Sequence, residues 1–119
     1  MIRDPETLKQ LVDLIERFVN ERLIPAENQL AEEAKLPETL LQEMKSLGLF
    51  GLTIPEEYGG LGLTMEEEIQ VSIALGHTSP AFRSILGTNN GIGSAAIVFD
   101  GIEAQKQKYL PKYASGEWV

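Results

Sequence analysis

The chain has 119 residues, no cysteine, one histidine and a formal net charge of −8 at pH 7. This length is typical of one domain that can bury a hydrophobic core without stabilising cross-links. The absence of cysteine excludes disulfides and Cys-ligated metal. Fifteen of the 18 acidic side chains lie in residues 1–68, and such a surface repels nucleic acid. We expect no signal peptide, and the uncharged run 84–99 is too short and too polar to span a membrane.

The N-terminal segment predicts an amphipathic helix. Asp4 can cap a helix that begins at Pro5, and apolar residues then recur at helical spacing as far as Leu23. Pro25 donates no backbone hydrogen bond and disfavours helical geometry at Ile24. We therefore expect a break or kink at this point, followed by a short continuation of the apolar pattern.

A second helix and an apolar loop follow. The helix is predicted over residues 37–47, and Gly48 stands where a left-handed terminating residue belongs. Residues 49–63 hold four glycines and one proline, which exclude regular helix, yet they are too apolar for a plain surface loop. We expect this loop to be packed against the rest of the domain. Its adjacent carboxylates Glu56 and Glu57 are expected to have no catalytic role, because no nearby partner would tune their pKa.

The third predicted helix begins with a capping box. Thr64 and Glu67 have the required spacing, and acidic residues in the first turn favour the helix N-terminus. His77 falls at the C-terminal end, where a lone histidine is more often a local cap than a catalyst. The residues that we expect on the inner face are Met65, Ile69, Ser72, Ile73 and Gly76.

Residues 79–99 predict a central helix, which is uncharged over most of its length and is therefore expected to be buried. Ser79 can cap it, and Pro80 suits its first position. Gly87 and Gly91 would let a neighbour approach the backbone closely. That neighbour is either another helix, which the spacing favours, or a ligand.

The remaining residues predict one last helix over 102–109, closed by Pro111, with Tyr113 and Trp118 as apolar anchors in the tail. The run from Gly91 to Ala96 matches the Gly-x-Gly-x-x-Ala dinucleotide fingerprint. That fingerprint requires a preceding β-strand. Because the preceding residues predict helix, we assign no dinucleotide site, and we find no Walker or metal-ligand motif.

Two stretches carry a family resemblance. Residues 49–63 contain Gly-Leu-Thr-Ile-Pro-Glu-Glu-Tyr-Gly-Gly-Leu-Gly, which closely resembles the loop that marks the N-terminal domain of acyl-CoA dehydrogenases. Residues 100–118 resemble a second stretch of that family, and the resemblance covers essentially the whole chain. It implies an all-α fold, an orthogonal bundle of about five to six helices, with residues 1–119 as a single N-terminal domain.

The resemblance also implies what the chain lacks. Family members are about three times longer, with a middle β-domain and a C-terminal helical domain that hold FAD between them. The catalytic glutamate, which takes the α-proton while hydride moves to flavin N5, belongs to the C-terminal domain. We therefore expect no catalytic residue here, and no activity or tight FAD binding from a fragment that ends at Val119.

The same family uses this domain to line part of the acyl channel. When the chain is aligned on residues 101–110, the channel-lining, substrate-binding positions are expected at five residues of the central helix. These residues are Ser84, Ile85, Thr88, Asn89 and Ile92.

The function implied by the resemblance is FAD-dependent oxidation of a fatty acyl-CoA to the trans-2-enoyl-CoA by the intact enzyme. It also implies an electron-transferring flavoprotein as acceptor, a homo-oligomer, and a place in the bacterial cytoplasm or the mitochondrial matrix. The alternative is a non-catalytic helical module of the same ancestry that serves in binding or oligomerisation.

Overall fold

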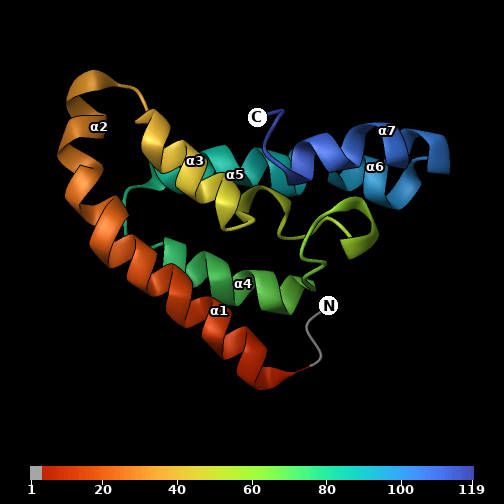
Figure 1. Cartoon of the computed structure of the whole chain (residues 1–119), viewed down its shortest axis with the longest axis horizontal. Helices are drawn as coiled ribbons and strands as arrows, with labels where there is room; N and C mark the ends of the chain where they lie inside the picture. Colours follow the sequence, from red (N-terminus) through yellow and green to blue (C-terminus); the bar gives the residue numbers. More distant parts are fainter. Residues whose placement is uncertain (1–3) are drawn as a thin grey trace.

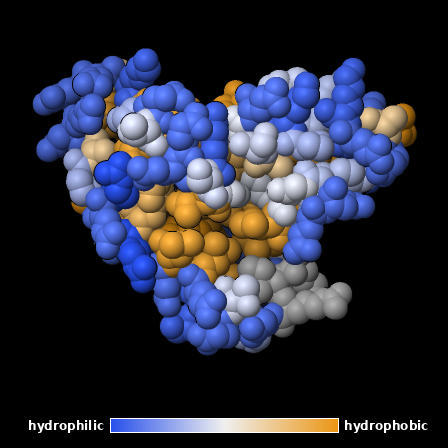
Figure 2. Space-filling model, viewed as in Figure 1, coloured by the Kyte–Doolittle hydropathy of each residue, from blue (hydrophilic) through white to orange (hydrophobic). Residues whose placement is uncertain are grey.

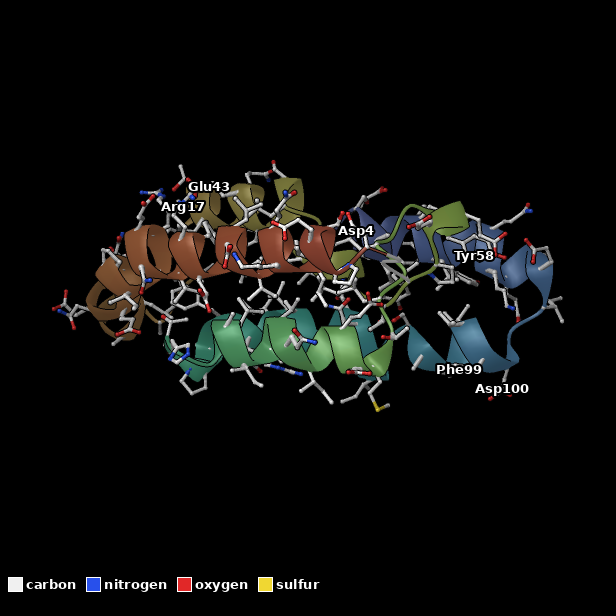
Figure 3. The ribbon with its side chains drawn as sticks, turned by 90° about the horizontal axis from the view of Figure 1, so that it is seen from below. Asp4, Arg17, Glu43, Tyr58, Phe99 and Asp100 are labelled. Carbon is white, nitrogen blue, oxygen red and sulfur yellow. The ribbon has the colours of Figure 1, made fainter. Side chains whose placement is uncertain are left out.

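The computed structural model describes residues 4–119, which form helices and connecting loops and contain no strand. The predicted all-α class is confirmed. Figures 1 and 3 show two layers, with α1, α3 and α7 in one and α4, α5 and α6 in the other. The α-helices are α1 (Pro5–Phe18), α2 (Glu27–Glu33), α3 (Glu38–Ser46), α4 (Met65–Leu75), α5 (Pro80–Gly87), α6 (Ala95–Asp100) and α7 (Glu103–Ala114). Short π or 3₁₀ segments are η1 (Val19–Leu23), η2 (Ile24–Ala26), η3 (Leu49–Gly51), η4 (Glu56–Tyr58) and η5 (Thr88–Ile92).

Helix α1 begins as predicted and ends differently. The Asp4 side chain accepts a hydrogen bond from the Glu6 N–H at 3.0 Å and so caps the helix. Beyond α1 the chain stays helical through the π turn η1 and the 3₁₀ turn η2, and Ile24 keeps right-handed helical angles (φ −58°, ψ −47°). The expected break therefore takes the form of a change of helix type, and Ile24 itself keeps helical angles. Because Pro25 has no N–H, the helix changes type here rather than stopping.

The loop 49–63 is packed, as predicted, and contains no α-helix. Gly48 ends α3 with φ 76°, in the left-handed region where glycine carries no penalty. Two further glycines allow close approach of backbone. A Cβ on Gly51 would lie 2.9 Å from the Cα of Ala114 in α7, and a Cβ on Gly60 would collide with the Ile54 carbonyl. The first contact packs the loop against α7, and the second folds the loop closely on itself.

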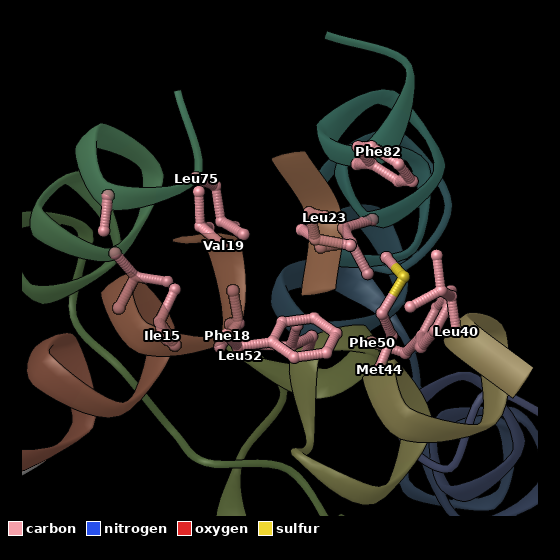
Figure 4. Packing of buried hydrophobic residues seen from close by; sticks show 14 of the residues in the cluster. Ile15, Phe18, Val19, Leu23, Leu40, Met44, Phe50, Leu52, Leu75 and Phe82 are labelled. Carbon is pink, nitrogen blue, oxygen red and sulfur yellow. The ribbon is translucent and has the colours of Figure 1, made fainter. Parts of the chain in front are cut away.

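The loop also supplies much of the hydrophobic core. Figure 4 shows Phe50 and Leu52 of the loop region among residues from α1, η1, α3 and α5. Phe50 and Met44 are fully buried in this main cluster. A second cluster consists of Ile54, Tyr58, Leu110 and Ala114, and it joins the loop to α7.

Helix α4 is capped as predicted but faces the other way. Thr64 N–H donates to Glu67 Oε1 at 2.9 Å, and Glu67 N–H donates to Thr64 Oγ1 at 3.3 Å. The inner face was wrongly predicted, because the helix carries two apolar stripes and packs on α1 through the other one. The buried residues are Glu67, Val71, Ala74 and Leu75, whereas Met65, Ile69 and Ile73 are 77%, 52% and 63% exposed.

Helix α7 continues five residues beyond its predicted end, with Pro111 inside it. The Pro111 carbonyl accepts from Ser115 N–H at 3.1 Å, so the helical bonding resumes after the proline. The expected aromatic anchors are present. The ring centre of Trp118 lies 5.9 Å from those of Tyr109 and Tyr113, and Lys112 Nζ lies 4.7 Å from that of Trp118. These contacts hold the tail against the C-terminal turns of α7, around Pro111.

Polar contacts tie the elements together across long sequence separations. Arg22 binds Glu43 of α3 through two nitrogens, the shortest distance being 2.8 Å. Glu27, at the start of α2, accepts from Thr78 Oγ1 at 2.7 Å and from Ser79 N–H at 2.9 Å. The second contact places a carboxylate at the N-terminus of α5, where the helix dipole favours it.

The exposed surface is mixed in character. Figure 2 shows apolar surface in the notch between the part that contains α1 and α4 and the part that contains α3 and α7. Most of the remaining surface in this view is polar. Among the described residues, no helix is both long enough and apolar enough to cross a membrane.

Candidate functional site

The five residues predicted to line a channel lie on α5 and η5. Helix α5 begins where the sequence indicates, since the Ser79 side chain accepts from Ala81 N–H at 3.3 Å and Pro80 occupies the first helical position. The predicted single helix over 79–99 is divided, however. It becomes a π turn over Thr88–Ile92, then a turn, then the separate helix α6.

The π turn has identifiable causes. Gly93 N–H donates to the Thr88 carbonyl at 2.7 Å, an i to i+5 bond. The Asn89 carbonyl accepts from the Ser94 hydroxyl, and the Asn90 carbonyl accepts from Thr53 Oγ1 at 2.7 Å. Side-chain hydroxyls therefore donate hydrogen bonds to backbone carbonyls in the turn. These bonds compete with the backbone hydrogen bonds of a regular α-helix.

The structure separates the five predicted residues into two groups. Ser84 and Thr88 are exposed, and Ile92 is 90% exposed, so these three form a row along the open side of α5 and η5. Ile85 is half-buried and packs against the main hydrophobic cluster. Asn89 is fully buried and is not part of the open row.

Asn89 and Asn90 hold this segment in place. Asn89 Nδ2 donates to the carbonyls of Tyr113 and Trp118 at 3.1 and 2.7 Å. Asn90 Nδ2 donates to the carbonyls of Leu49 and Leu86 at 2.8 and 3.0 Å. The structural role of Asn90 was not predicted from the sequence. The only available signal was the pair of asparagines in an otherwise uncharged run, which is unfavourable in a helix interior unless both amides are bonded.

The described residues bring together no group of three or more His, Cys, Asp or Glu side chains that could hold a metal ion. Glu56 and Glu57 are exposed on η4, and His77 is exposed just after the end of α4. The Gly91–Ala96 run lies in η5 and α6 and follows a helix, so it forms no phosphate cradle of the strand–turn–helix type.

Comparison with known proteins assigns the chain to a family. A family model described as the acyl-CoA dehydrogenase N-terminal domain matches residues 5–117. The chain belongs to this family. The helical fold and the marker loop at residues 49–63 are thus family features, and the family resemblance predicted from the two sequence stretches is confirmed.

Individual relatives of the chain are also acyl-CoA dehydrogenases. The mitochondrial very long-chain specific acyl-CoA dehydrogenase of Macaca fascicularis is 43% identical over 112 residues, which are 94% of this chain and 17% of the relative. The (2S)-methylsuccinyl-CoA dehydrogenase of Cereibacter sphaeroides is 38% identical over 113 residues, 94% of this chain and 20% of the relative. The chain therefore spans about one-sixth to one-fifth of the length of these curated relatives.

Two solved structures share the fold. An acyl-CoA dehydrogenase from Bacillus anthracis, complexed with FAD, matches with a TM-score of 0.80 and 33% identity over 97% of this chain and 20% of that one. A chain described as an electron transferring flavoprotein of Acidaminococcus fermentans matches with a TM-score of 0.85 and 28% identity. It covers all of this chain and 32% of that one.

Proposed function

We propose that this chain is the N-terminal domain of an FAD-dependent acyl-CoA dehydrogenase that oxidises a fatty acyl-CoA to the trans-2-enoyl-CoA. The observation that carries the channel assignment is the open row of Ser84, Thr88 and Ile92. These side chains are small or apolar and uncharged, and they point away from the core of their own domain. An acyl chain binds in a narrow, largely apolar groove, and in this proposal the row forms one wall of that groove.

In this proposal the chain contributes binding and enclosure rather than chemistry. The row contacts the polymethylene chain and excludes water from it, while Ile85 and Asn89 support the row from behind. FAD, when bound, supplies the hydride acceptor. The residues described here do not fit the role of holding it, because their one glycine fingerprint is helical. We place FAD and the catalytic base outside residues 1–119.

The partners follow from the same proposal. The substrate is an acyl-CoA, the electron acceptor is an electron-transferring flavoprotein, and the intact enzyme is a homo-oligomer. Cellular location follows the relatives and is either the cytoplasm of a bacterium or the mitochondrial matrix. The 119-residue chain alone should neither retain flavin nor reduce an acceptor with acyl-CoA. A yellow flavin spectrum that persists through gel filtration would contradict this part of the proposal.

The channel assignment is tested in a chimera. This chain replaces the corresponding domain of the Bacillus anthracis acyl-CoA dehydrogenase, and Thr88→Phe is introduced. The added ring should obstruct long acyl chains and spare short ones, because each excluded methylene is worth roughly 1–3 kcal/mol of discrimination. We expect kcat/KM for long relative to short acyl-CoAs to fall by tens to hundreds of fold.

Two controls separate obstruction from damage to the fold. Thr39→Phe places the same ring on an exposed site of α3, far from the row in the sequence, and should leave the chain-length profile unchanged. The melting temperature of each variant is measured alongside. An equal loss of kcat/KM at all chain lengths with a lowered melting temperature would make Thr88 a packing residue and remove it from the channel.

A further inference from the structure

A hollow of about 260 Å³ lies between the start of α4, the end of the loop 49–63 and the segment formed by η5 and α6. It is separate from the proposed acyl row, since Ser84, Thr88 and Ile92 do not line it. Figure 3 shows Phe99 on the side of the molecule where α4 also lies. The apolar wall of the hollow consists of Leu63, Met65, Ala95, Val98 and Phe99.

The polar atoms around the hollow that have no hydrogen-bond partner are acceptors. Glu68 is half-buried there, and its carboxylate makes no hydrogen bond or ion pair with the described residues. Asn90 also borders the hollow and is 6% exposed. Its Nδ2 is already used by two backbone carbonyls, and its Oδ1 is buried with no hydrogen-bond partner among the described residues. Thr53 is the remaining polar residue, and its hydroxyl donates to the Asn90 carbonyl.

This chemistry defines the ligand. A half-buried carboxylate without a partner favours a cation over an acyl chain, a carboxylate or a phosphate. The volume suits one long side chain better than a drug-sized molecule. A guanidinium group supplies five donors in a plane, is weakly hydrated and stacks on aromatic rings. Phe99, which is 81% exposed, offers such a ring at the rim.

We propose that this hollow binds an arginine side chain presented by a partner protein. The aliphatic stem packs against Leu63 and Val98, and the guanidinium donates to the Glu68 carboxylate. The surface as a whole supports a basic partner, because the chain carries a net charge of −8 and 15 of its 18 acidic residues lie in residues 1–68, which include the first turn of α4.

The test uses n-butylguanidinium as the probe and the ¹⁵N-labelled 119-residue chain. Binding is followed by the amide chemical shifts of Thr53, Gly91 and Ala95. We expect saturable shifts at these three amides with a dissociation constant in the millimolar range. Neutral n-butylurea, which has nearly the same shape, should bind at least about threefold more weakly, since it lacks the charge that pairs with Glu68.

Two variants complete the design. Glu68→Gln should weaken n-butylguanidinium binding by about three- to tenfold. Glu66→Gln, on the same helix but outside the hollow, should change it by less than about twofold. Equal binding of n-butylurea, tighter binding of n-butanol at the same amides, or the absence of saturable shifts would overturn the proposal. None of these readouts involves acyl-CoA or flavin, so failure here is distinct from failure of the channel assignment.

Discussion

At the scale of single residues, the neighbouring side chains of Asn89 and Asn90 donate hydrogen bonds to two different parts of the chain. Asn89 donates to the C-terminal segment at Tyr113 and Trp118, whereas Asn90 donates to Leu49 at the start of the marker loop. Adjacent side chains on a helix point about 100° apart, so one π turn can hold two distant segments at once. The position of the exposed row on α5 and η5 therefore depends on hydrogen bonds made by the buried side of the same segment.

Tyr58 makes a residue-scale prediction about alkaline pH. Its hydroxyl lies 2.8 Å from both carboxylate oxygens of Glu103, and Figure 3 shows it beside α7. Burial, followed by the hydrogen bond to Glu103, raises the pKa of Tyr58 to about 12. Above pH 10 the unfolded chain loses this proton while the folded chain keeps it. Stability supplied by Tyr58 is thus full below pH 10 and is lost as the pH rises toward 12.

The measurement is urea unfolding between pH 8 and pH 12, with tyrosinate absorbance as a second readout. Tyr58→Phe should flatten the decline in unfolding free energy over pH 10–12. In the folded wild-type chain, one tyrosine should titrate near pH 12. If no tyrosine of the folded chain ionises as late as pH 12, the assigned environment of Tyr58 is wrong.

At the scale of elements, the residues that begin and end the helices could be predicted from the sequence, but the face that each helix buries could not. The caps at Asp4, Ser79 and Gly48 depend on residues within a few positions, and each was predicted correctly. The exposed stripe of α4 was taken for its buried one, because both stripes have helical spacing and only the partner helix α1 decides between them. The π turn at residues 88–92 likewise depends on hydrogen-bond acceptors and donors that belong to segments distant in the sequence.

Glu27 makes an element-scale prediction about the junction of α2 and α5. Its carboxylate accepts from Thr78 and Ser79, so Glu27→Ala leaves a partly buried hydroxyl and an N–H group without their partner. A hydrogen bond to a charged group contributes about 1.5–3 kcal/mol. We expect the unfolding free energy in urea to fall by about that amount. Glu32→Ala, at an exposed site of the same helix, is the control and should have little effect.

At the scale of the whole molecule, the notable feature is apolar surface outside the core. Besides the stripe of α4, Ile92, Phe99 and Ile102 are 90%, 81% and 65% exposed. Isolated apolar side chains are ordinary at protein surfaces, but a stripe along one helix favours association. In the proposed intact enzyme this surface would be available to other parts of the assembly.

The corresponding prediction concerns the 119-residue chain in solution. We expect a helix-dominated far-ultraviolet spectrum and self-association that strengthens with concentration in sedimentation velocity. Ile69→Glu, in the middle of the α4 stripe, should weaken association without lowering the melting temperature. Gln70→Glu adds the same charge at the adjacent exposed position and is the matched control. A chain that stays monomeric at all concentrations would contradict the prediction.

The π turn η5 also bears on evolution. An i to i+5 turn holds one residue more than an α-helical turn of the same span, so a single-residue deletion there can be absorbed by return to α-helical geometry. Such a deletion would leave the flanking helices in their original orientation and would redirect only the side chains within the turn. A gapless sequence alignment through residues 88–92 would then pair side chains that face different ways. Acyl-CoA dehydrogenases could change the lining of a channel by gaining or losing one residue, with no substitution in the channel itself.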